Sequence, residues 1–90
     1  MSKSNRELER IVKGFANHRR LEILQLLGKE PGLSVQEVSD KLKSEFKNIS
    51  AHVGKMHIAG LVYKKNEGNI VRHTLTNRGK SILQFVRIIE

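Results

Sequence analysis

Four histidines, His18, His52, His57 and His73, are the side chains of this sequence that most readily bind metals or transfer protons. A metal site needs two or three such groups that converge, but the five-residue spacing of His52 and His57 places them about 140° apart around a helix. Cysteine is absent, so thiolate ligands and disulfides are excluded. No Ser-His-Asp arrangement, carboxylate pair or glycine-rich phosphate loop is visible. We therefore expect no enzyme, no metal site and no cofactor.

The segment EFKNISAHVGKMHIAGLV, residues 45–62, points to a different chemistry, the reading of base edges. At about 100° per residue, Ile49, Val53 and Met56 form the inward row of a helix over about 45–60. A helix that enters a DNA major groove needs small residues where its backbone approaches the bases, and donors or acceptors beside them. The outward face has this composition, with Asn48 and Ser50 toward its flanks: Lys47, Ala51, Gly54, Lys55 and Ile58.

Five of these side chains have a chemically suitable partner on duplex DNA. Ala51 could meet a thymine methyl group, Asn48 could pair with adenine, and Ser50 could bond to a base or a phosphate. Lys47 and Lys55 could meet phosphates or guanine. The sequence leaves open which of Lys47, Asn48 and Ser50 reaches a base.

The alternative is that this face is the solvated side of an ordinary surface helix. An exposed Ile58 and a mid-helix Gly54 argue against that alternative, because glycine costs about 1 kcal/mol relative to alanine in a helix interior. Gly54 could equally relieve contact with a neighbouring helix.

The residues after Gly60 change to the two-residue period of strands. LVYKKNEGNIVRHTLT, residues 61–76, reads as two short strands around NEGN, where Gly68 and Asn69 can take the positive φ angles of a tight hairpin. Basic and polar side chains crowd this ribbon and could reach flanking phosphates or a minor groove: Lys64, Lys65, Asn66, Asn69, Arg72 and His73. The alternative is a charged edge that resists aggregation.

The net charge of +8 is concentrated in one part of the chain. Residues 46–80 contain seven lysines and arginines against a single acid, Glu67. A concentrated positive field favours a polyanion, and the nucleic-acid backbone is the commonest one inside cells. We therefore expect double-stranded DNA as a partner, although basic surfaces also keep small proteins soluble.

Helices must position these groups, and the first part of the chain has the corresponding patterns. Residues 4–15 carry an apolar stripe at helical spacing. Asn17 can cap a second helix over 18–28, which Gly28 closes. KEPGL is then a turn, and Ser34 with Glu37 forms the capping box of a short third helix that stops around Lys43.

The last helix begins after the hairpin, where Thr76 or Asn77 can cap it. Ile82, Phe85, Val86 and Ile89 line one side, while Leu83 and Ile88 lie outside that arc. We therefore predict a mainly α fold with a small β-hairpin, a winged helix-turn-helix of order α-α-α-α-β-β-α. Residues 1–90 are expected to form a single domain.

Without a signal peptide or an apolar run that could span a membrane, we expect a cytoplasmic protein, nucleoid-associated if prokaryotic.

Four segments together resemble the ArsR/MarR-type winged helix transcriptional regulators. FANHRRLEILQLL resembles the family's second helix and the residues before it, SVQEVSDKL the helix before the turn, and ISAHVGKMHIAGLV the recognition helix with the first wing strand. HTLTNRGKSIL is similar to the end of the wing in MarR- and PadR-like relatives. The resemblance covers residues 15–84, but the turn LKSEFKN lacks the usual glycine and has Glu45 where many relatives have a capping Ser or Thr.

The resemblance implies a sequence-specific regulator of double-stranded DNA, with the wing at 61–75. Base-facing roles then fall on Lys47, Asn48, Ser50, Ala51 and Lys55. Phosphate roles fall on His52, Lys64, Lys65 and Arg72.

The resemblance also implies a homodimer in which the first and last helices pack together. The interface residues would be Leu8, Ile11, Val12 and Phe15 with Ile82, Phe85, Val86 and Ile89. The cysteine-containing metal motif of the arsenic- and cadmium-sensing members is absent, and the sequence names no effector ligand. A winged helix that serves only as a protein-interaction or dimerisation module remains the alternative function.

Overall fold

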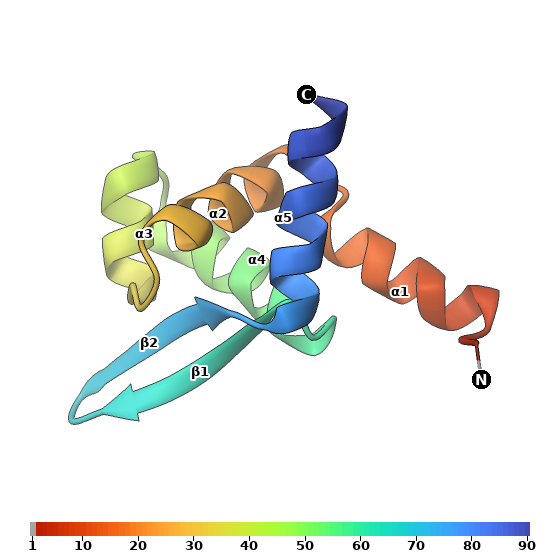
Figure 1. Cartoon of the computed structure of the whole chain (residues 1–90). Helices are drawn as coiled ribbons and strands as arrows, with labels where there is room; N and C mark the ends of the chain where they lie inside the picture. The colour runs from red at the N-terminus through yellow and green to blue at the C-terminus, as the bar shows by residue number, and fades with distance from the viewer. Residues whose placement is uncertain (1) are drawn as a thin grey trace.

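The computed structural model describes residues 2–90 as five helices and one antiparallel hairpin (Figure 1). This order confirms the predicted winged helix-turn-helix. None of the helices in the described residues is long and apolar enough to cross a membrane. The elements are α1 (Asn5–Phe15), α2 (His18–Lys29), α3 (Val35–Leu42), α4 (Phe46–Ile58), β1 (Val62–Glu67), β2 (Ile70–Leu75) and α5 (Asn77–Ile89).

Side-chain caps fix where four of the helices begin. Ser34 forms a capping box with Glu37, and Ser4 forms a second one at the start of α1. The Asn17 side chain accepts hydrogen bonds from the first turn of α2, and the Thr76 hydroxyl accepts one from the Gly79 N–H at 3.0 Å. These side chains satisfy amide groups that have no partner inside the helix, so the predicted starts of α2 and α3 are confirmed.

The turn between α3 and α4 forms without glycine. Lys43 takes the left-handed conformation with φ 53°, and the Ser44 N–H donates to the Ser39 carbonyl at 3.0 Å. A non-glycine residue pays about 1–2 kcal/mol for this conformation. Glu45 then occupies the N-cap of α4 without a side-chain cap hydrogen bond, so the helix begins at Phe46 although Glu45 replaces the usual capping Ser or Thr.

The core lies between α2, α3, α4 and the base of the hairpin. Ile23, Leu24 and Leu27 of α2 are at most 1% exposed. Ile49 and Met56 of α4 are fully buried and Val53 is 2% exposed, so the predicted inward row is confirmed. This burial fixes which face of α4 points outward.

The buried side of α5 differs from the one that the spacing suggested. Leu83 and Val86 are buried in the core, whereas Phe85 and Ile89 are exposed. A side chain at Gly28 of α2 would overlap with the Leu83 side chain, so the two helices approach closely there. Leu83, which lies outside the arc of Ile82, Phe85, Val86 and Ile89, therefore faces the core, because this approach decides which side of α5 is buried.

The hairpin pairs Val62 with Leu75 at its base and Glu67 with Ile70 at its tip. Gly68 has φ 63°, while Asn69 is not among the residues with positive φ. A two-residue turn with positive φ only at its first position matches the type II′ hairpin turn, so the expectation for Asn69 was wrong. The loop before α3 adds a bridge to the hairpin, in which the His73 N–H donates to the Leu33 carbonyl at 2.9 Å.

Candidate nucleic-acid interface

The outer face of α4 is open to solvent along its length. Helices α1, α2 and α3 and strand β1 contact α4 from the other side. The five side chains that were predicted to read bases are all exposed, and within residues 2–90 none of them makes a side-chain hydrogen bond or ion pair. They are Lys47, Asn48, Ser50, Ala51 and Lys55. This face can therefore donate to and accept from an external partner without first breaking an internal contact.

Gly54 lies on this outer face, and the structure decides between its two explanations. A Cβ at Gly54 would meet no atom within 4 Å. Relief of contact with a neighbouring helix is therefore excluded. The missing side chain instead leaves room for an approaching surface, and the neighbouring Ile58, 84% exposed, also faces outward.

Replacing Gly54 by alanine should separate stability from binding. The free energy of unfolding should rise by up to about 1 kcal/mol, since alanine is the better helix former and its methyl group meets open space. Affinity for duplex DNA should fall if the helix backbone must approach the bases closely. Urea unfolding and a DNA titration on the same sample check both effects. Unchanged affinity would contradict a close approach at Gly54.

His52 is half-buried on the flank of α4, where it meets α2. The Nε of Arg20 donates to His52 Nδ1 at 3.1 Å. Burial first, and then the charge of Arg20, lower the pKa of His52 below its usual 6.5. With Nδ1 accepting, the neutral ring carries its proton on Nε2. The phosphate role of His52 stays a prediction, and such a contact would be made by a neutral donor.

Lys64 and Lys65 are exposed on β1, as a DNA-contacting wing requires. Neighbouring residues of a strand point to opposite faces, and these lysines pair across the hairpin with His73 and Arg72 respectively. Lys64 lines a hollow of about 420 Å³ between the hairpin and the starts of α3 and α4. The two lysines therefore project from opposite faces of the hairpin.

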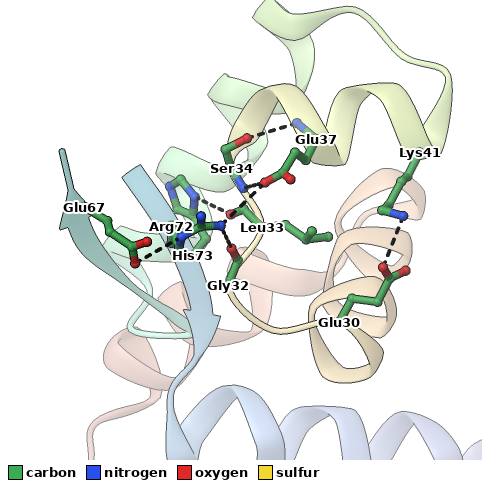
Figure 2. Close-up of polar contacts among 9 residues, drawn as sticks. All are labelled: Glu30, Gly32, Leu33, Ser34, Glu37, Lys41, Glu67, Arg72 and His73. Carbon is green, nitrogen blue, oxygen red and sulfur yellow. Dashed lines mark hydrogen bonds and ion pairs between the residues drawn. The ribbon is translucent and has the colours of Figure 1, made fainter. Parts of the chain in front are cut away.

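Arg72 is bound within the protein rather than free on the wing (Figure 2). Its Nη1 donates to the Gly32 carbonyl at 3.0 Å, and its Nε lies 3.2 Å from Glu67 Oε2. The Glu37 carboxylate is 3.9 Å from the guanidinium and also accepts from the Ser34 N–H at 2.9 Å. Arg72 thus ties the hairpin to the start of α3, and its predicted phosphate role would have to compete with two carboxylates.

His73 is buried, contrary to the prediction that it belongs to the polar surface of the wing. It is 3% exposed, and its Nδ1 lies 3.1 Å from the Leu33 carbonyl oxygen (Figure 2). Burial lowers the pKa of His73 below the usual 6.5, partly opposed by the hydrogen bond to Leu33. The ring therefore serves the junction of hairpin and loop in its neutral form.

Folding stability should consequently decrease in mildly acidic solution. Above about pH 6.5 the His73 ring is neutral in both the folded and the unfolded chain. Below that pH the unfolded chain takes up a proton that the folded chain resists, which costs at most about 1.4 kcal/mol per pH unit for each such histidine. Urea unfolding at pH 7.5 and pH 5.0 should show a smaller loss in His73→Gln than in the wild type. The exposed His57→Gln is the matched control, and an equal loss in both variants would contradict this assignment.

A basic cluster beside α4 was missed in the sequence. Arg10 and Lys13 of α1, Arg20 of α2 and Lys55 of α4 line a hollow of about 450 Å³ together with Gly14 and Ile58. Only Lys55 belonged to the predicted interface. The three-residue spacing of Arg10 and Lys13 places them on one side of a helix, but nothing in the sequence shows that this side meets α4.

The residues expected at a dimer interface divide into three groups. Exposed apolar side chains are Leu8, Val12, Phe85 and Ile89, at 45%, 49%, 49% and 65% exposure. Ile11, Phe15 and Ile82 are partly buried against the protomer's own core. Val86 is itself part of that core, so it can reach a partner only slightly.

Within residues 2–90 no group of three or more histidines or acids could hold a metal ion.

Comparison with known proteins agrees with this architecture. The family model described as HVO_A0114 matches residues 16–77. The transcriptional activator HlyU of Vibrio cholerae is 36% identical over 78 residues, which span 86% of this chain and 70% of HlyU. A solved structure of HlyU from Vibrio cholerae is 30% identical, with a TM-score of 0.84, over 99% of this chain and 97% of that one.

A more distant structure shows the fold alone. It is a winged helix-turn-helix DNA-binding domain from Mycobacterium bovis, described as homodimeric and as a possible ArsR-family regulator. It is 23% identical, with a TM-score of 0.84, over 99% of this chain and 88% of that one. With the family match and the similarity to HlyU, the chain belongs to the HVO_A0114 family and to the ArsR-type winged helix-turn-helix transcriptional regulators.

Proposed function

We propose that this regulator binds a specific sequence of double-stranded DNA, with α4 in the major groove and residues 61–75 on the flanking backbone or in the minor groove. The observation that carries the proposal is the outer face of α4. It combines exposed donors that have no internal partner, such as Lys47 and Asn48, with the small residues Ala51 and Gly54. This combination fits a helix whose backbone comes close to base edges.

The protein acts as a homodimer in this proposal. Helix α1 extends away from the rest of the fold (Figure 1), whereas α5 packs on α2. Both helices expose apolar side chains, which include Leu8, Val12 and Phe85. Exposed apolar patches on small proteins mark interaction surfaces. The homodimeric description of the Mycobacterium bovis domain supports a dimer.

Selection of preferred sites from a pool of random duplexes tests the proposal. A dimer with two-fold symmetry should select an inverted repeat, with half-sites separated by about one helical turn or a multiple of it. Failure to enrich any sequence would contradict specific DNA binding. That outcome, together with binding to an acidic protein, would favour the protein-interaction module instead.

A further inference from the structure

The hollow between α1 and α4 is a second basic site, apart from the wing and adjoining the reading face of α4 at Lys55. We call it the α1–α4 groove and define it by Arg10, Lys13, Arg20 and Lys55, which surround an apolar floor. Gly14 brings the two helices together, because a Cβ at Gly14 would overlap with the Cβ of Ala59. The close approach holds cations from three helices around one cavity of about 450 Å³.

The positive charge of this groove is largely uncompensated. Lys13 pairs with Glu9 at 3.1 Å, and Glu9 is exposed. Within residues 2–90 no ion pair involves Arg10, Arg20 or Lys55. The Arg20 guanidinium donates hydrogen bonds to two neutral groups, the Lys13 carbonyl at 2.6 Å and His52 Nδ1 at 3.1 Å. These bonds orient the guanidinium without neutralising it, as suits a group that binds an anion.

Helix α1, which forms one wall of the groove, and the hairpin extend in different directions from α4. In Figure 1, α1 extends to one side of the C-terminal end of α4 and the hairpin to the other. A helix in the major groove has a phosphodiester strand on each side, because the groove is about 12 Å wide. The wing lysines can serve one of these strands. Lys55 belongs both to the outer face of α4 and to the groove, so the groove is continuous with the reading face.

The groove also lies apart from the apolar stripe of α1. At about 100° per residue, Arg10 and Lys13 lie about 160° and 140° around the helix from Leu8. A partner subunit on the stripe of Leu8 and Val12 would therefore leave these two cations accessible.

We propose that the α1–α4 groove binds a backbone phosphate of the DNA duplex, on the strand opposite to the one that the wing contacts. This inference rests on the proposed function, and it adds Arg10, Lys13 and Arg20 to the interface. Contacts of this kind fix the position of a protein on the duplex and carry no sequence information of their own.

Replacing Arg10 and Lys13 by glutamine tests the groove. Each lost phosphate contact should reduce the negative slope of log affinity against log salt by about 0.9, which corresponds to about a fivefold loss of affinity at 0.15 M salt. Arg10→Gln should show part of this loss, and Arg10→Gln/Lys13→Gln should show the whole of it, because both cations surround the same phosphate site. The loss should be equal on the selected duplex and on a random duplex. Both can be measured by fluorescence anisotropy between 0.1 and 0.4 M KCl.

Lys80→Gln is the matched control, because Lys80 is an exposed cation in a different hollow, between α2, β2 and α5. It should leave affinity and slope unchanged. Thermal melting should be the same for all variants, since the replaced side chains are exposed. If Arg10→Gln melts early, Lys13→Gln alone gives the same readout.

Unchanged affinity and slope in the double variant would refute the phosphate site in the α1–α4 groove while leaving the proposed function intact. A loss confined to the selected duplex would also overturn it, because it would indicate a base contact. If the wild type showed no preference for any duplex, the proposed function itself would be refuted.

Discussion

Replacing Lys47 and Asn48 by alanine should strongly reduce the preference of the protein for its selected DNA sequence. Both residues are exposed in the first turn of α4, where the N-terminal end of a recognition helix meets base edges. A good base contact contributes about 1–3 kcal/mol of discrimination. Two such contacts would lower affinity for the selected duplex by about 30-fold or more. Binding to random duplex should change far less, because the phosphate contacts remain.

A matched control for this pair is available on α5. Lys80→Ala/Gln84→Ala removes one cation and one amide from the hollow between α2 and α5, and should leave the preference intact. If the double variant at Lys47 and Asn48 kept the full preference for the selected duplex, the assignment of α4 as the reading helix would be wrong. A uniform loss on all duplexes would show that these residues contact only the backbone.

Leu8→Glu/Phe85→Glu should produce a folded monomer that binds its DNA site weakly. Both side chains are about half exposed in the protomer, so the fold does not depend on them, whereas a buried carboxylate without a partner opposes association. Loss of the second half-site contact should reduce affinity for an inverted repeat by about 10²–10⁴-fold. Light scattering at micromolar concentration gives the mass, and a titration with the selected duplex gives the affinity.

The control for the dimer variant places the same charge on another exposed apolar residue. Ile70, 45% exposed at the tip of the hairpin, is changed to glutamate, and this variant should keep the mass of the wild type. A monomeric wild type, or a dimeric Leu8→Glu/Phe85→Glu variant, would refute the proposed dimer.

Local rules in the sequence were sufficient to predict the order of the elements. The capping side chains at Asn17 and Ser34 mark helix starts because they satisfy amides within three residues of themselves. The inward row of α4 followed from the helical period alone. These features depend on neighbours along the chain, so a single sequence contains them.

Features that depend on contacts between distant segments could not be predicted. His73 is buried because the loop at Leu33 pairs with β2, and Arg72 is held by groups from that loop and from α3. The left-handed Lys43 is likewise imposed by the turn rather than favoured by a lysine. The basic groove beside α4 exists because Gly14 lets α1 approach Ala59. In each case the position of a partner far along the chain decides the role of the residue.

The most direct test of specific DNA recognition is the ratio of two affinities at physiological salt. The wild-type protein is titrated with its selected duplex and with a duplex of scrambled sequence and equal length, at 0.15 M salt. Specific recognition through α4 predicts a ratio of about a thousandfold or more. Equal and weak binding to both duplexes would contradict it.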